Sequence, residues 1–276
     1  MTRGDTPVLL RALTFLTRLL PPFWRVSGVS NRMIKPIWRL LGDGKTHVLP
    51  IWNDIVMTID PCEVVGGNLA FIPQLYDRWE RALVGELLPH NGVFVDVGSN
   101  IGAYSLWAAS FLDSSGRVLA LEADPDNYQL LTGNIGLNNK QGIVTTVLGG
   151  VADSNQQLRF YKNTKGNKGA HSFAGSGNDF IEIQCRPLLD ILQSNNIDRV
   201  DFMKLDIEGF EEKVLTKFFA DTTETSPLRP KYLLVEIQGG PVIDLADQER
   251  IKNMICSNGY ELTIDKSNSF FKRKAI

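Results

Sequence analysis

Residues 93–109 read VFVDVGSNIGAYSLWAA, an apolar run followed by a turn that contains two glycines. Only Asp96 interrupts the apolar run over 93–97, which is typical of a strand buried inside a parallel sheet. The turn from Gly98 to Gly102 follows at once, and the residues after it predict a helix over 103–111. Strand, glycine turn and helix in this order predict the first unit of a doubly wound α/β sheet.

The segments that follow continue this alternation of strands and helices. Residues 117–123 read RVLALEA and predict the second strand. Asp124 can cap the next helix, with Pro125 in its first turn. Further strands are predicted over residues 144–148, 158–161, 181–185, 202–205 and 232–237. The alternation predicts an α/β protein with a doubly wound sheet.

The glycine turn indicates a ligand site with a ribose but without a pyrophosphate. Glycines let a backbone approach a ligand, and the amino end of the following helix offers unpaired N–H groups. A dinucleotide fingerprint needs G-x-G-x-x-G, and its middle glycine is absent here. Glu122 closes the second strand, where a carboxylate can accept hydrogen bonds from both hydroxyls of a ribose.

A second group of acidic residues occurs in residues 201–215, DFMKLDIEGFEEKVL. Asp206 and Glu208 are two residues apart at a strand end, so both are expected on the side where such sheets bind ligands. With a pKa raised by burial, one carboxylate could take a proton, or the two could hold a divalent metal ion. Alternatively, Glu208 caps the next helix and Asp206 binds a cofactor amine. Lys204 is expected to point to the other side of the strand.

Taken together, these segments resemble class I S-adenosylmethionine-dependent methyltransferases, and specifically the FkbM family. The resemblance covers residues 76–262 and rests on four segments in order: 93–109, 116–139, a looser part over 159–192, and 201–215. It implies a Rossmann-like sheet and methyl transfer, mostly to hydroxyls of natural products, glycans or lipid-linked sugars. A small-molecule, glycan or lipid acceptor is therefore expected.

The resemblance also implies roles for single residues. Asp96 and the backbone of the glycine turn should hold the methionine part of S-adenosylmethionine, and Glu122 should hold its ribose. Asp153 lies where adenine is usually bound. The cofactor-binding residues implied are Asp96, Gly98, Asn100, Gly102, Glu122, Ala123, Asp153 and Asp206. The candidate catalytic residues are Asp206, Glu208 and His171, the last as a base on a closing loop. No metal ligand is assigned, although a divalent ion is left open, and Glu236 is a candidate substrate contact.

Three other functions are weighed against O-methyl transfer. An N-methyltransferase differs only in the accepting atom. A nicotinamide dehydrogenase is disfavoured by the missing glycine and by the lack of a Tyr-x-x-x-Lys or Cys/His set. A non-catalytic scaffold that binds the cofactor and docks through a basic N-terminus is disfavoured by the presence of Asp96, Glu122 and Asp206.

Composition excludes several classes of protein and divides the chain unevenly. The 276 residues have a net charge of −2, which gives no sign of nucleic-acid binding. Three scattered cysteines and three scattered histidines exclude a disulfide framework and a histidine-rich metal site. Residues 1–50 carry eight basic and two acidic side chains, a net of +6, whereas the remainder carries a net of −8. The N-terminus is therefore expected to be a separate element.

The N-terminal element begins with a predicted amphipathic helix over residues 8–20, VLLRALTFLTRLL. Leucines 9, 13, 16 and 20 recur at helical spacing, with Arg11, Thr14 and Arg18 on the other side. Either this helix packs on the main domain, or residues 8–40 contact an anionic membrane surface or cover a substrate. We predict a basic helical extension over 1–45, a β-hairpin segment over 46–75, a helix over 75–88 and a catalytic domain over 76–276. The protein is expected in the cytoplasm, with peripheral membrane contact left open.

Overall fold

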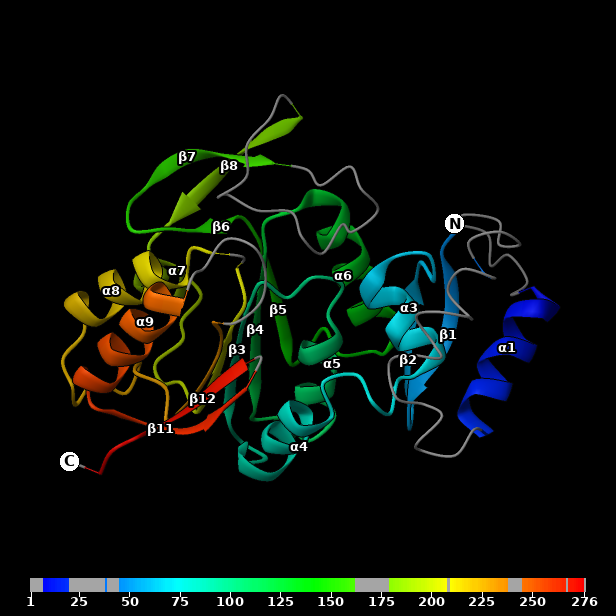
Figure 1. Cartoon of the computed structure of the whole chain (residues 1–276), viewed down its shortest axis with the longest axis horizontal. Helices are drawn as coiled ribbons and strands as arrows, with labels where there is room; N and C mark the ends of the chain where they lie inside the picture. Colours follow the sequence, from blue (N-terminus) through cyan, green and yellow to red (C-terminus); the bar gives the residue numbers. More distant parts are fainter. Residues whose placement is uncertain are drawn as a thin grey trace.

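A seven-stranded sheet with the order β11-β12-β10-β9-β3-β4-β5 forms the centre of the computed structural model (Figure 1). The structure describes residues 7–19, 38, 45–161, 179–207, 209–237, 245–266 and 268–275. The strands are β3 (Val93–Val97), β4 (Arg117–Glu122), β5 (Val144–Leu148), β9 (Phe202–Leu205), β10 (Tyr232–Glu236), β11 (Tyr260–Asp265) and β12 (Asn268–Arg273). From β5 to β10 the strands are parallel, and β12 and β11 complete the sheet as an antiparallel hairpin.

Helices cover both faces of this sheet, which confirms the predicted doubly wound α/β fold. One face is covered by α4 (Arg78–Leu87), α5 (Ala103–Ala109) and α6 (Pro125–Leu137), and the other by α7 (Leu188–Ser194), α8 (Glu211–Asp221) and α9 (Leu245–Ser257). Phe94 packs in the first of these cores, whereas Val93, Val95 and Val97 pack in the second. A strand buried on both faces therefore needs the continuous apolar run seen in the sequence.

The strand order reverses beside β3. The chain runs outward from β3 through β4 to β5, and then returns to place β9 on the opposite side of β3. Open sheets of this kind bind ligands at such a reversal, outside the carboxyl ends of the strands. The fold thus places the glycine turn after β3 and the acidic segment after β9 next to each other.

Two parts of the fold differ from the sequence prediction. The predicted strands over 158–161 and 181–185 do not join the central sheet. They form a separate three-stranded sheet of β6 (Gly150–Val151), β8 (Phe180–Arg186) and β7 (Gln156–Tyr161). The hairpin of β11 and β12 was not predicted, although polar and apolar residues alternate along β11. Alternation identifies a strand but does not say which sheet it joins.

The N-terminal segment contains the predicted hairpin, β1 (His47–Trp52) paired with β2 (Ile55–Ile59), and then an unexpected helix, α3 (Val64–Phe71). Part of the segment predicted to form the hairpin, including Gly66 and Gly67, is thus helical. A Cβ atom on Gly66 would lie 2.0 Å from the Asp60 carbonyl oxygen, so glycine allows this helix to approach the backbone closely. The predicted helix over 75–88 is confirmed as α4.

Two asparagines, Asn134 in α6 and Asn138 directly after it, fix the hairpin to this helix. The Asn134 side chain accepts from the Thr58 N–H and donates to the Thr58 carbonyl, at 2.7 and 3.3 Å. Asn138 does the same with Val56, at 2.9 and 2.6 Å. These side chains satisfy backbone groups of β2 as a neighbouring strand would. The hairpin and α3 therefore pack directly against the helices of the main domain.

The predicted N-terminal helix is confirmed as α1 (Val8–Leu19), but it packs through a different face from the one expected. Leu10, Thr14 and Thr17 are buried, with α3 in contact, whereas Leu9 and Leu16 of the predicted apolar stripe are exposed. Among the described residues, no helix combines the length and the apolar character that crossing a membrane requires.

Candidate active site

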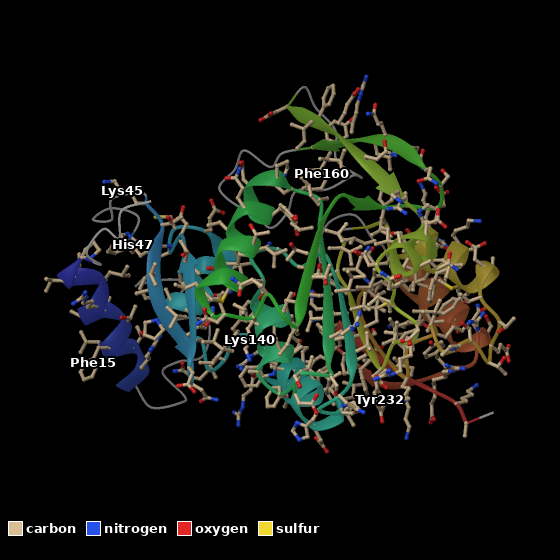
Figure 2. The ribbon with its side chains drawn as sticks, turned by 180° about the vertical axis from the view of Figure 1, so that it is seen from behind. Phe15, Lys45, His47, Lys140, Phe160 and Tyr232 are labelled. Carbon is tan, nitrogen blue, oxygen red and sulfur yellow. The ribbon has the colours of Figure 1, made fainter. Side chains whose placement is uncertain are left out.

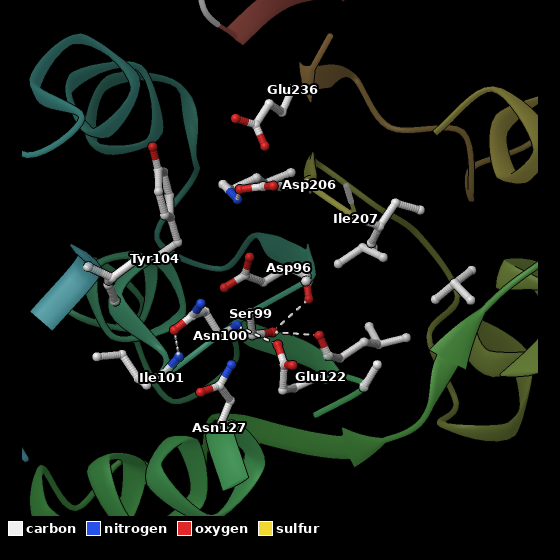
Figure 3. Close-up of a pocket in the computed structure, with 18 of the residues that line it drawn as sticks. Asp96, Ser99, Asn100, Ile101, Tyr104, Glu122, Asn127, Asp206, Ile207 and Glu236 are labelled. Carbon is white, nitrogen blue, oxygen red and sulfur yellow. Dashed lines mark hydrogen bonds and ion pairs between the residues drawn. The ribbon is translucent and has the colours of Figure 1, made fainter. Parts of the chain in front are cut away.

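A cavity of about 350 Å³ lies at the carboxyl ends of β3, β4, β9 and β10, within the range of roughly 300–1,000 Å³ that is usual for small-molecule sites (Figure 3). Glu122 and Asn127 lie at one end, Asp206 and Glu236 at the other, and Asp96 lies between them. Of the predicted site residues, the cavity wall includes Asp96, Gly98, Asn100, Glu122, Ala123 and Asp206. The fold thus brings together both motifs identified in the sequence.

The glycine turn after β3 has a tightly specified backbone. Gly98 has a φ of 82°, and a Cβ atom there would lie 1.8 Å from the Asp206 carbonyl oxygen. The Ser99 hydroxyl donates to the carbonyls of Asp96 and Leu121, at 2.8 and 3.1 Å. Gly102, with a φ of 90°, directly precedes α5 and is absent from the cavity wall. The two glycines therefore shape the turn, and Gly98 also lets the β9 segment approach β3.

Glu122 is buried at the end of β4, and two backbone groups hold its carboxylate. Its Oε2 accepts from the Asn100 N–H at 2.7 Å, and its Oε1 accepts from the Asp124 N–H at 2.8 Å. Burial raises the pKa of Glu122 to about 7, although these hydrogen bonds oppose the shift. Each oxygen keeps further acceptor capacity in a residue that lines the cavity.

Asp153 lies outside the cavity wall. Its exposed side chain accepts from Ser154 Oγ at 3.4 Å and from Gln156 Nε2 at 3.0 Å. Residues 149–151, just before it, line the cavity instead.

Asp96 is fully buried, and one of its oxygens has no hydrogen-bond donor among the described residues. Its Oδ2 accepts from Ser105 Oγ at 2.6 Å, while its Oδ1 has no partner in the described part of the chain. Burial raises the pKa of Asp96, and the Lys204 ammonium is the main opposing influence. Buried polar atoms normally have partners, so an unpaired carboxylate oxygen beside a cavity indicates a ligand that donates to it.

Lys204 lies on the same side of the sheet as Asp96 and Asp206, so the expectation that it points away is wrong. Residues two apart on a strand share a face, and Lys204 is also the register partner of Asp96 on the neighbouring strand. Its Nζ lies 2.6 Å from Asp206 Oδ2. Burial lowers the pKa of Lys204, but Asp206 and Asp96 outweigh it and raise the pKa overall, so the side chain stays charged.

Asp206 has a lowered pKa, contrary to the expectation of a raised one. Burial alone would raise this pKa. The Lys204 ammonium, a hydrogen bond with Glu236 and the hydrogen bond from Lys204 together lower it by more than burial raises it. Its side chain is 31% exposed, toward the cavity. A hydrogen bond between two carboxyl groups needs one proton, and the nearby ammonium favours Asp206 as the ionised partner.

Two of the three predicted catalytic residues, Glu208 and His171, lie outside the described residues. Glu211 is the first residue of the following helix, α8, and its side chain holds the turn that precedes the helix. The Glu211 carboxylate accepts from the N–H groups of Ile207 and Gly209, both at 2.9 Å. This buried side chain thus holds the turn that follows Asp206.

The sequence reasoning missed a group of cavity residues contributed by the segment before the main sheet. Asp77 precedes α4 with a φ of 41° and does not cap that helix. It accepts instead from the Tyr104 hydroxyl at 3.1 Å, and burial raises its pKa. Lys204 Nζ lies 4.8 Å from the centre of the Tyr104 ring. An Asp before a helix resembles an ordinary cap in the sequence, so only the unusual backbone conformation marks Asp77 as a site residue.

The residues Val64, Val65 and Asn68 of α3, together with Tyr76 and Asp77, form one wall of the cavity. The cavity therefore extends across the boundary predicted between residues 75 and 76. Within the described ranges, no three His, Cys, Asp or Glu side chains are grouped so that they could hold a metal ion.

Comparison with known proteins relates this chain to a family of methyltransferases. The methyltransferase FkbM domain model matches residues 96–262. Methyltransferase sdnD of Sordaria araneosa is 25% identical over 187 residues, which cover 52% of this chain and 71% of that protein. The hexuronic acid methyltransferase AglP of Haloferax volcanii is 26% identical over 167 residues, which cover 59% of this chain and 64% of that protein.

Among solved structures, the methyltransferase FkbM from Methylobacillus flagellatus KT aligns with a TM-score of 0.47 and 17% identity, over 90% of this chain and 62% of that one. The chain thus spans less than two thirds of AglP and of this structure. The family match covers more than half of the chain and includes Asp96, Glu122 and Asp206. The chain therefore belongs to the FkbM family and is a methyltransferase.

Proposed function

We propose that the protein transfers a methyl group from S-adenosylmethionine to a hydroxyl group of a glycan, a lipid-linked sugar or another natural product. The observation that carries this proposal is the cavity itself, in which a backbone-held carboxylate at one end faces an ionised aspartate at the other. When bound, S-adenosylmethionine supplies an electrophilic methyl group on a positively charged sulfur.

The residues at the Glu122 end fit this cofactor. The Glu122 carboxylate can accept from both ribose hydroxyls, because each oxygen already has one backbone donor and keeps further capacity. The unpaired Asp96 Oδ1 can accept from the amino group of the methionine part. Gly98, Asn100 and Ala123 line the same wall. A carboxylate-rich cavity also suits a cationic ligand.

We assign to Asp206 the role of binding and deprotonating the acceptor hydroxyl. Its carboxylate is ionised and reaches the cavity, so it can orient the hydroxyl and accept its proton while the oxygen bonds to carbon. Lys204 holds this carboxylate in place and keeps it charged. The Lys204 ammonium also occupies the cation position beside Asp206, which favours a base over a divalent metal ion. Glu208 and His171 remain further candidates from the sequence.

The charges around the Asp206 end favour a neutral or cationic acceptor. Among the described residues, Asp77, Asp206 and Glu236 line this end together with one cation, Lys204. An acceptor carboxylate, as in the hexuronic acid named for AglP, would face net negative charge. An amine acceptor is therefore the second candidate. A screen for labelled methyl transfer over neutral sugars, uronic acids and amines tests this choice, and a preference for uronic acids would contradict it.

Replacing Glu122 by alanine is expected to weaken S-adenosylmethionine binding at least tenfold, or about 1.4 kcal/mol. The variant loses both acceptors for the ribose hydroxyls, and it also frees the N–H groups of Asn100 and Asp124. Isothermal titration calorimetry measures the change. Glu86→Ala, on the exposed side of α4, is the matched control and should bind normally. Equal affinities for the Glu122 variant and the wild type would refute the assignment.

The affinity for S-adenosylmethionine is also expected to fall as the pH drops through about 7. The raised pKa of Glu122 means that its carboxylate, the form that accepts two hydroxyls, becomes protonated in this range. If only the ionised form binds, the apparent affinity falls about tenfold between pH 8 and pH 6.

Glu122→Gln removes this titration while keeping the shape of the side chain, so its affinity should vary little over the same range. This control separates Glu122 from Glu211, whose pKa burial also raises to about 7. A wild-type affinity that is constant from pH 8 to pH 6 would contradict the expectation.

A further inference from the structure

The outer face of α1 carries an unusual concentration of exposed apolar side chains. Val8, Leu9, Phe15 and Leu16 are 83%, 38%, 62% and 57% exposed. They are half of the large apolar side chains that are exposed among the described residues. Figure 2 shows Phe15 on the outer side of the helix, which lies at the end of the molecule beyond the hairpin (Figure 1).

These four side chains form one continuous face. Val8 and Phe15, like Leu9 and Leu16, are seven residues apart, which is two helical turns. The opposite face, with Leu10, Thr14 and Thr17, is buried. Surface helices normally bury their apolar face and show the polar one. In α1 the two threonines face the protein beside Leu10, whereas the four exposed apolar side chains face outward.

Positive charge accompanies this face. The helix has no acidic residue, Arg11 is exposed beside the apolar side chains, and Lys45 is exposed at the start of the next described segment. Residues 1–50 have a net charge of +6, against −8 for the rest of the chain. An apolar helix face beside the exposed Arg11, in a segment of the sequence with a net positive charge, matches a bilayer surface with anionic headgroups.

We propose that α1 is a membrane-surface contact, with its outer face in the headgroup–acyl boundary of an anionic bilayer and Arg11 toward the lipid phosphates. The alternative is that this face of α1 binds a second copy of the chain. A 12-residue helix is about 18 Å long and about 10 Å wide, so its face offers roughly 200 Å². A stable protein interface needs roughly 800 Å² from each partner, so this face alone is too small for one.

Cosedimentation of the full chain with vesicles tests the proposal. The wild type should bind vesicles of phosphatidylcholine and phosphatidylglycerol, and should bind pure phosphatidylcholine vesicles less well. The double variant Phe15→Ser, Leu16→Ser should have a partition coefficient at least tenfold lower. Arg11→Glu should reduce the preference for anionic vesicles, because it reverses the charge that the lipid phosphates attract. Added salt should reduce the same preference in the wild type, because it screens this attraction.

Leu245→Ser is the matched control, since Leu245 is 78% exposed on α9 and should leave vesicle binding unchanged. The replaced side chains of α1 are exposed, so the unfolding midpoint of each variant should match that of the wild type and show that folding is intact. Absent wild-type binding, or equal binding by the double variant, would overturn the proposal. If light scattering shows that the wild type is a dimer and the double variant a monomer, the face would instead be an interface with a second copy of the chain.

Discussion

Asp206→Asn is expected to lower the rate of methyl transfer by about 10²- to 10⁴-fold while S-adenosylmethionine still binds. The amide keeps the size of the side chain but cannot accept the hydroxyl proton, and it removes the charge that Lys204 compensates. Single-turnover transfer of a labelled methyl group measures the rate, and calorimetry measures binding.

Asp198→Asn is the matched control, because this aspartate is 86% exposed on a loop outside the cavity. A chelator should leave the wild-type rate unchanged if Asp206 acts as a base beside Lys204. A near-normal rate for Asp206→Asn would place the base elsewhere, with His171 as the next residue to replace. If a chelator stops the reaction and magnesium restores it, the result would favour a divalent metal ion at Asp206, the alternative that the sequence left open.

Gly98→Ala is expected to lower the free energy of unfolding by about 2–5 kcal/mol. An alanine at a φ of 82° is strained by about 1–2 kcal/mol. Its Cβ would also overlap the Asp206 carbonyl oxygen, 1.8 Å away, and overpacking costs about 1–3 kcal/mol more. Because that atom belongs to the backbone of the neighbouring segment, no side-chain rotation relieves the contact.

Urea unfolding measures this loss. Gly133→Ala is the matched control, since Gly133 lies within α6 and the added Cβ would meet no atom of another described segment within 4 Å, so the change should be neutral or stabilising. Equal stability of Gly98→Ala and the wild type would mean that the turn can move away from β9, and that the cavity wall at Asp206 is less fixed than the structure indicates.

The parts of the fold that could be predicted from the sequence are those that depend on local pattern. The continuous apolar run of β3 and its glycine turn identify a buried parallel strand that ends at a ligand site. The positions of Asp96 and Glu122 on adjacent strand ends follow from this topology. The two-residue period of a strand also places Lys204 on the same side as Asp206, as the structure shows.

Other features depend on contacts between distant segments. The packing face of α1 is one example, because helical spacing does not say which side meets α3. Thr14 and Thr17 can face the protein because their hydroxyls donate to the carbonyls of Arg11 and Thr14, both at 3.0 Å. Hydroxyls satisfied within the helix can be buried at low cost. The direction of Asp77, set by its αL backbone, depends equally on tertiary contacts.

The most direct test of the proposed function is a calorimetric titration of the full chain with S-adenosylmethionine and, separately, with NADH. Binding of one S-adenosylmethionine per chain, weakened at least tenfold in Glu122→Ala and retained in Asp206→Asn, is the predicted result. Binding of NADH without binding of S-adenosylmethionine would contradict the proposal that this cavity holds a methyl donor.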